Sequence, residues 1–487
     1  MSEIKNLEPK ALWGYFDDLC KVPRPSKKEE KVIDFLMNWA ADNNIEAIKD
    51  EVGNILMKKP ATPGMENRKT IIMQSHIDMV CEKNNDTVHD FDNDPIQPYI
   101  DGDWVKAKGT TLGADDGIGV AAQMDMLTAN DVKHGPIECL YTIDEETGLT
   151  GAFALKPNFF EAEILLNLDS EDDGEIFIGC AGGIDTVANI TYTTERPQED
   201  CRFFKIEVKG LKGGHSGDEI DKGHGNSNKI LNRILHYSSD NFGLRLNNFD
   251  GGNLRNAIPR EANASFCIPA NNIDNFKQYF NTISENIKAE NKVIEGNLEI
   301  ILSEINSLDF ALIDIDTQKN LFNALHACPH GVISMSPSME GMVSTSTNLA
   351  SVKFKEANKI EITTSQRSDS ESMKADIAAM VKSVFELANF ETTQGDGYPG
   401  WEPNPDSEIL VIARDSYKKL FDVEPVVRSI HAGLECGLFL EKYPKLDMVS
   451  FGPTLREVHS PAERVLIPTV SKFRKHLVDI LENAPVK

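Results

Sequence analysis

The stretch Ile71-Ile72-Met73-Gln74-Ser75-His76-Ile77-Asp78 sets the first expectation about the fold. A short apolar run of this kind is typical of a strand buried in a parallel sheet. His76 stands at the end of the run, and Asp78 follows two residues later. In open α/β sheets, ligands and reacting groups gather just beyond the carboxyl ends of the strands. His76 is therefore a candidate functional residue, and Asp78 is close enough in sequence to orient its imidazole.

The same pattern, a predicted strand or turn that leads into acidic side chains, recurs three times further along the chain. The three places are a glycine-rich turn at 109–119 with Asp115, a strand predicted at 137–143 before Asp144-Glu145-Glu146, and a strand predicted at 164–168 before Asp169. Acidic residues at loop starts are often simply solvated, and this remains the plain alternative in an acidic protein. Their recurrence after His76 favours a shared cation site.

The glycine-rich turn precedes a helix predicted at 120–128, and such a turn can also hold a phosphate group. It has no Walker lysine and no G-x-G-x-x-G pattern, which argues against a nucleotide site. Two adjacent carboxylates, Asp115 and Asp116, would repel an anion. The turn suits a cation instead, because its glycines let Asp115 approach closely.

A second histidine follows a late strand. The strand predicted at 448–451 leads to His459-Ser460-Pro461. Zinc binds histidine nitrogen and carboxylate oxygen, whereas calcium prefers oxygen ligands alone and fits less well. Two histidines and several acids exceed the needs of one tetrahedral ion, so two ions about 3.5–4 Å apart would fit.

In such a two-ion site Asp78 would hydrogen-bond His76 rather than bind metal. One of the neighbours Glu145 and Glu146 would bind metal, and the other would take a proton from a bridging water. Covalent catalysis is disfavoured, because the chain has no G-x-S-x-G and Cys436 has no base nearby in sequence.

Composition narrows the class of protein. The chain has 487 residues, which predicts two or three domains. With 50 basic and 77 acidic residues its net charge is −27, which argues against nucleic acid or an anionic membrane as partner. Eight scattered cysteines without C-x-x-C predict free thiols. Together with the absence of an apolar signal segment or spanning run, they predict a cytoplasmic protein.

The order of predicted elements indicates an interrupted domain. Residues 8–20 and 26–42 are predicted helices, the second with Ser26 and Glu29 as a capping box, and 82–103 is a predicted long loop. From 187 to 400 the order strand-helix-strand-strand-helix occurs twice, with 203–209 and 298–305 as the opening strands. We therefore predict an α/β domain with a central, mostly parallel sheet over 1–186 and 401–487, interrupted by an α+β lid over 187–400 with internal duplication.

Several motifs resemble the co-catalytic zinc peptidases of the aminoacylase and carboxypeptidase-G type, and the resemblance extends over nearly the whole chain. The motifs lie at residues 74–80, 83–91, 113–117, 144–148, 167–170, 211–217, 253–260, 431–439 and 458–461.

The resemblance implies a catalytic domain with two zinc ions, for which cobalt or manganese can substitute. It assigns Asp115 as the bridging ligand, His76 and Asp169 to one ion, and Glu146 and His459 to the other. It also makes Glu145 the general base and Asp78 the residue that orients His76. In the lid, His215 would stabilise the oxyanion, while Asn256 and Arg367 would bind substrate, Arg367 at the free carboxylate.

The implied activity is hydrolysis of unblocked dipeptides, including carnosine-like Xaa-His dipeptides. Two enzymatic alternatives are a deacylase of N-acyl amino acids and a broader exopeptidase. An alternative of another class is a non-catalytic, metal-dependent peptide binder. The resemblance further implies a homodimer formed through the lid, unless the duplicated lid replaces a partner subunit.

Overall fold

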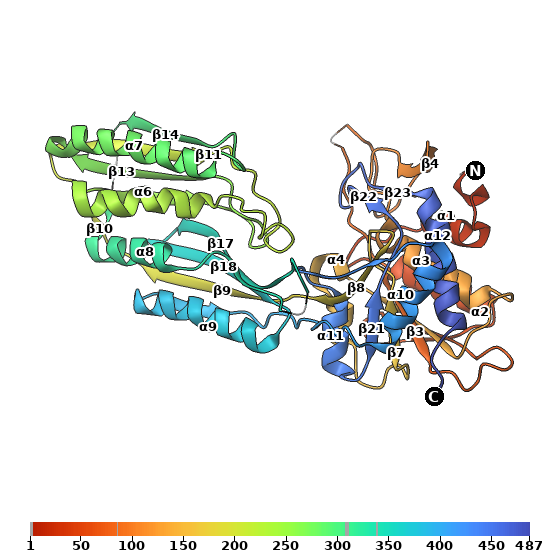
Figure 1. The fold of residues 1–487 in the computed structure, drawn as a ribbon. Helices are drawn as coiled ribbons and strands as arrows, with labels where there is room; N and C mark the ends of the chain where they lie inside the picture. Colours follow the sequence, from red (N-terminus) through yellow and green to blue (C-terminus); the bar gives the residue numbers. More distant parts are fainter. Residues whose placement is uncertain (1–2, 85, 307–310, 338) are drawn as a thin grey trace. The chain divides into compact units, whose positions relative to one another are not determined.

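Two units make up the chain in a computed structural model that describes residues 3–84, 86–306, 311–337 and 339–487 (Figure 1). Unit 1 comprises Met1–Cys180, Trp401–Ser429 and Leu434–Lys487, and unit 2 comprises Ala181–Gly400 and Ile430–Gly433. Both chain ends belong to unit 1. Asn85, in the motif at 83–91, lies outside the described residues. The assignment of the two units as catalytic domain and lid stays a prediction.

Unit 1 is built on a sheet with the strand order β1-β2-β6-β3-β7-β21-β8-β20. Its central strands β6, β3, β7 and β21 all pair in parallel. All six residues of β3 are buried, as expected for an inner strand covered on both faces. The bounds are β1 Glu46–Lys49, β2 Ile55–Lys59, β3 Ile71–His76, β6 Ile137–Thr142, β7 Ile164–Asn167, β8 Glu175–Cys180, β20 Val426–Ile430 and β21 Asp447–Ser450. The prediction of a mostly parallel central sheet in an α/β fold is confirmed.

Helices cover this sheet, with α3 against β3 and α10 against β21. They are η1 Ile4–Asn6, α1 Lys10–Leu19, α2 Glu30–Asp42, α3 Ala114–Thr128, α4 Glu145–Gly148, α5 Thr150–Ala154, α10 Glu408–Phe421, α11 Glu435–Lys442 and α12 Ile467–Glu482. A second, four-stranded sheet has the order β22-β23-β5-β4. Its strands are β4 Pro98–Asp101, β5 Trp104–Ala107, β22 Leu455–Arg456 and β23 Arg464–Leu466. The predicted loop at 82–103 is thus partly wrong, since β4 lies within it.

Unit 2 has a nine-stranded sheet with the order β14-β11-β13-β12-β17-β18-β9-β19, to which β16 adds at β17. The strands are β9 Gly182–Thr191, β11 Cys201–Lys209, β12 Arg245–Gly251, β13 Ala262–Pro269, β14 Glu299–Ile305, β16 Gly331–Met335, β17 Val343–Lys355, β18 Lys359–Ser368 and β19 Glu391–Gln394. A short pair joins β10 Thr194–Glu195 to β15 Leu312–Ile313. The helices are α6 Ser227–Phe242, η2 Ala270–Asn272, α7 Ile273–Asn291, α8 Ile315–Ala327 and α9 Glu371–Leu387, and one apolar core joins α6–α9 to the sheet.

The strands and helices of unit 2 form two halves in which the elements follow the same order. One half is β11-α6-β12-β13-α7-β14, and the other is β9-α8-β17-β18-α9-β19 with the first half inserted after β9. The sequence pattern placed 298–305 at the start of the second repeat. That placement is wrong, because β14 pairs with β11 and closes the first half. The second half starts at β9, which runs across residue 186, where the domain boundary was expected.

The predicted capping box at α2 is also wrong. The helix begins at Glu30, and its first residues receive no side-chain cap. Ser26 Oγ instead donates to Asp78 Oδ2 at 2.7 Å, and Glu29 Oε1 accepts the backbone N–H of Lys27 and of Asp144. Both side chains therefore form hydrogen bonds with loop residues instead of capping α2.

Within the described residues, no helix combines the length and the apolar character needed to cross a bilayer.

Candidate metal centre

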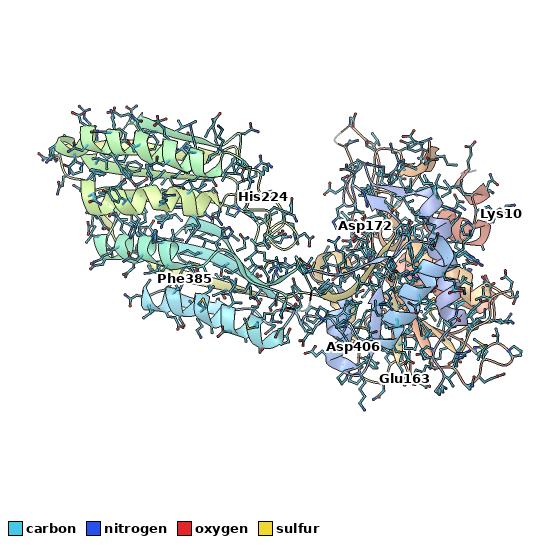
Figure 2. All side chains as sticks on the ribbon, viewed as in Figure 1. Lys10, Glu163, Asp172, His224, Phe385 and Asp406 are labelled. Carbon is cyan, nitrogen blue, oxygen red and sulfur yellow. The ribbon has the colours of Figure 1, made fainter. Side chains whose placement is uncertain are left out.

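Parallel pairing brings four predicted site residues to one edge of the unit 1 sheet. His76, the last residue of β3, lies opposite Thr142 of β6, and Gln74 lies opposite Asn167 of β7. The residues that follow these strands, Asp144–Glu146 and Asp169, therefore emerge beside His76. Asp172, labelled in Figure 2, lies three residues beyond Asp169 and marks this edge.

The first cluster contains His76, Asp115 and Asp169, whose ligand atoms lie within 4.8 Å of one another. Nε2 of His76 is 3.0 Å from Oδ1 of Asp115 and 3.4 Å from Oδ1 of Asp169. The His76 side chain is buried, and the two carboxylates are only slightly exposed. One imidazole nitrogen thus faces two carboxylates in a largely water-free setting.

The second cluster contains Asp115, Glu146 and His459 and shares Asp115 with the first. Nε2 of His459 is 3.2 Å from Oδ2 of Asp115 and 3.0 Å from Oε2 of Glu146. The two oxygens of Asp115 therefore face different histidines, Oδ1 toward His76 and Oδ2 toward His459. His459 adopts a positive φ of 60°, a conformation that costs a non-glycine residue about 1–2 kcal/mol.

Asp78 lies on the other side of the His76 ring. Its Oδ1 is 3.3 Å from Nδ1 of His76, and its carboxylate also accepts the backbone N–H of Glu145 at 3.0 Å and of Glu146 at 3.3 Å. With the Ser26 hydroxyl as a further donor, this buried carboxylate connects three loops of the site.

Burial and mutual repulsion disfavour the charged forms of several carboxyl groups in the site. Burial, together with the nearby carboxylates of Asp169 and Glu146, raises the pKa of Glu145 well above its usual range. Burial raises the pKa of Asp169 to about 7. Burial and the Asp169 carboxylate likewise raise the pKa of Asp116 well above its usual range.

The pKa values of the two histidines are raised as well, here by the neighbouring carboxylates. Burial would lower the pKa of His76, but the carboxylates of Asp169 and Asp115 raise it well above its usual value. Hydrogen bonds to Asp115 and Glu146 raise the pKa of His459 to about 11. A proton and a metal ion compete for such nitrogens. The carboxylates that favour the protonated rings would therefore also favour a metal ion at the same positions.

The donors present fit metal ions. Two histidine nitrogens and three carboxylates form two overlapping sets, a chemistry typical of zinc. Oε1 of Glu146 is buried and has no hydrogen-bond partner among the described residues. A buried polar atom without a partner is costly in a protein, and a cation at this position would satisfy it.

Glu435 is a residue of this region that the sequence analysis missed. It is buried on α11, and its Oε2 accepts hydrogen bonds from Gln74 at 2.6 Å and Thr142 at 2.8 Å. Burial raises its pKa to about 8. In the sequence, Glu435 lies within the motif at 431–439, but no preceding pattern singled it out as a site residue.

The three predicted lid residues belong to unit 2. His215 lies in a loop whose far end is marked by the labelled His224 (Figure 2), and its Nδ1 accepts the backbone N–H of Asp218 at 3.2 Å. Asn256 accepts the N–H of Ser216 through its backbone oxygen at 2.8 Å, so the His215 and Asn256 loops are in contact. Arg367 Nη1 donates to the Tyr398 hydroxyl at 2.9 Å.

Comparisons with known proteins identify the family of the chain. The model of peptidase family M20/M25/M40 matches residues 72–483. The cytosol non-specific dipeptidase of Escherichia coli K12 is 46% identical over 487 residues, which is 100% of both chains.

Solved structures show the same relationship. The aminoacylhistidine dipeptidase of Vibrio alginolyticus superposes with a TM-score of 0.93 at 47% identity and covers 100% of this chain and 99% of its own. A tripeptidase from Staphylococcus aureus shares the fold, with a TM-score of 0.58, 15% identity and 98% and 99% coverage. The predicted resemblance is confirmed, and the chain belongs to peptidase family M20/M25/M40.

Proposed function

We propose that the protein is a metal-dependent dipeptidase that hydrolyses unblocked dipeptides, Xaa-His dipeptides included. The observation that carries the proposal is the position of Asp115, whose two oxygens lie 3.0 and 3.2 Å from His76 and His459. This is the arrangement that a carboxylate bridging two metal ions requires. The names of the two dipeptidases that align over the full chain support the substrate class.

We further propose that the site holds two zinc ions, with cobalt or manganese as substitutes. His76, Asp115 and Asp169 would hold one ion, and Asp115, Glu146 and His459 the other. Bound ions of this kind lower the pKa of a water toward about 7 and polarise a carbonyl group.

Glu145 is the proposed general base. Its ligand atom also lies within 4.8 Å of those of His76 and Glu146. In the two proposed ligand sets it binds neither ion, which leaves its carboxylate close to the ions and available for proton transfer. A raised pKa suits a group that accepts a proton from the attacking water and passes it to the leaving amine. Asp78 would fix the His76 ring through Nδ1 and the position of Glu145 through its backbone N–H.

In unit 2, we assign Arg367 to the free carboxylate of the substrate. Its side chain is buried and its Nε has no hydrogen-bond partner. Together with His215, its charge lowers the pKa of Asp218, but no carboxylate of a described residue lies within ion-pair distance of it. A buried guanidinium without an acidic partner is costly, and a substrate carboxylate would provide one. His215 is the proposed oxyanion donor and Asn256 a substrate-binding group.

A substrate panel tests the proposal. Zinc-loaded protein should hydrolyse Xaa-His and other dipeptides far faster than tripeptides or N-acyl amino acids. Preference for N-acyl amino acids would indicate a deacylase, and equal rates on longer peptides a broader exopeptidase. Two bound zinc ions without turnover of any of these would indicate a binding protein.

Location and assembly are proposals as well. We propose that the protein acts in the cytosol, which the name of the E. coli relative and eight free cysteines support. A homodimer through unit 2 remains one proposal for its assembly. Light scattering at several protein concentrations distinguishes a dimer from a monomer whose two lid halves substitute for a partner.

A further inference from the structure

One buried carboxylate holds the turn that carries Asp115. Glu463 is 2% exposed, and it accepts four backbone N–H groups of this turn. Oε2 accepts from Leu112 at 2.7 Å and Gly113 at 3.0 Å, while Oε1 accepts from Ala114 at 2.7 Å and Asp115 at 3.4 Å. Glu463 lies four residues after His459. It therefore connects the His459 segment directly to the turn that ends in Asp115.

A buried cation holds the same turn from the opposite side. Arg24 is 3% exposed. Its Nη1 donates to the carbonyls of Ile77 at 3.0 Å and Asp78 at 2.8 Å, and its Nη2 donates to the carbonyl of Gly113. No carboxylate of a described residue forms an ion pair with Arg24. It therefore connects the His76–Asp78 segment to the turn through backbone oxygens alone.

The glycines of the turn make room for this arginine. A Cβ atom on Gly113 would lie 2.6 Å from Nη2 of Arg24 and 2.8 Å from Sδ of Met79, and one on Gly117 would lie 2.6 Å from Nη2. Gly113 also has a φ of 70°, which favours glycine. Two glycines of the turn around Asp115, Gly113 and Gly117, are thus explained by the guanidinium that they accommodate.

We propose that Arg24 and Glu463 are positioning residues that set the spacing of the metal ligands. Glu463 accepts the N–H of Gly113, and Arg24 donates to the carbonyl of Gly113. Together they join three ligand-bearing segments that are distant in sequence: 76–78, 112–115 and 459–463. The inference rests on the proposed metal site. Groups that orient metal ligands typically change metal affinity or activity by about 10- to 100-fold when they are mutated.

The chemistry of the clamp, meaning Arg24 and Glu463 together, predicts which substitutions matter. Glutamine at 463 keeps the size of the side chain but replaces one acceptor oxygen by an NH₂ donor. Two of the four backbone N–H groups would then face a donor, and buried donors without acceptors are costly. Lysine at 24 keeps the charge but cannot present the planar fork that reaches carbonyls of two segments at once.

The test measures zinc affinity without substrate, by competition with a chromophoric chelator on metal-free protein. We expect E463Q to bind the second zinc equivalent about 10- to 100-fold more weakly than the wild type. With dipeptide substrate, kcat at limiting zinc should fall in parallel while KM changes less than about twofold. The matched control is E138Q: Glu138 is 3% exposed and accepts the backbone N–H of Glu161 and Ala162, both at 2.9 Å. It should lose thermal stability but keep wild-type zinc affinity.

Wild-type zinc affinity in folded E463Q, or an equal loss of affinity in E138Q, would overturn the proposal. If circular dichroism shows that E463Q does not fold, R24K and E463D take its place, since E463D keeps both acceptor oxygens. Both should fold and bind zinc more weakly, and unchanged affinity in both would again overturn the clamp. Failure of the wild type to hydrolyse dipeptides would instead refute the proposed function, because zinc affinity is measured independently of turnover.

Discussion

Asp78 holds Glu145 by its backbone: Oδ1 of Asp78 accepts the N–H of Glu145 at 3.0 Å. The same oxygen lies 3.3 Å from Nδ1 of His76. One buried carboxylate thus lies against both the proposed metal ligand and the backbone of the proposed general base. The role proposed for Asp78 is to hold both groups in place, so its replacement should affect both metal retention and rate.

Asp78→Asn tests that double role. The variant keeps one acceptor oxygen but loses the charge that stabilises the His76 ring, so we expect about 10- to 100-fold weaker zinc binding. kcat should fall further than occupancy alone explains, because Glu145 also loses its support. The milder Ser26→Ala removes only the 2.7 Å hydroxyl bond and should reduce kcat less than about tenfold. Equal effects of both variants would argue against the role of Asp78.

Glu145→Gln separates proton transfer from metal binding. Glutamine cannot accept the proton of the attacking water, so kcat should fall by several orders of magnitude while two zinc equivalents remain bound. Exposed Glu161, whose side chain is 83% exposed, provides Glu161→Gln as a control with unchanged rate and metal content. Near-normal hydrolysis by Glu145→Gln at full zinc occupancy would refute the assignment.

Arg367→Lys tests recognition of the substrate carboxylate. Lysine retains the charge but not the fork geometry, so KM for dipeptides should rise by about 10- to 100-fold with little change in zinc affinity. Dipeptide amides, which lack the carboxylate, should be poor substrates for wild type and variant alike. The preference for free dipeptides over their amides should therefore shrink in the variant. A preference as large as that of the wild type would exclude Arg367 from this role.

Several features of the site could be expected from the chain because they depend on local order. The apolar run before His76 predicts β3, and each proposed acidic ligand follows a predicted strand or the glycine-rich turn. The choice between Glu145 and Glu146 could not be made from pattern, since the two are adjacent and differ only in what their side chains face.

The parts that sequence reasoning missed depend on contacts between distant segments. Ser26 bonds Asp78 across 52 positions instead of capping its helix, and Glu463 reaches the Asp115 turn across about 350. Similarly, β14 joins β11 rather than opening the second half of unit 2. Local propensity cannot anticipate such pairings, because tertiary packing decides them.

A buried histidine predicts how stability depends on pH. His476 on α12 is 3% exposed and lies 2.8 Å from the Ala413 carbonyl through Nε2, and burial lowers its pKa to about 4. In the unfolded chain it titrates near about 6.5. The contribution of the neutral His476 ring to the free energy of unfolding is therefore complete above pH 6.5. It is lost as the pH falls toward 4, by about 3 kcal/mol in total. His476→Gln should flatten the fall in Tm between pH 7 and pH 5 relative to the wild type, and an unchanged acid profile would contradict the buried neutral ring.

The decisive measurement is a zinc titration of metal-free protein with turnover of an Xaa-His dipeptide followed at every step. A shared Asp115 between two ligand sets predicts two bound equivalents, with hydrolysis appearing as the second site fills. Full hydrolysis at one equivalent, or two bound equivalents with no hydrolysis of any dipeptide, would contradict a two-metal dipeptidase.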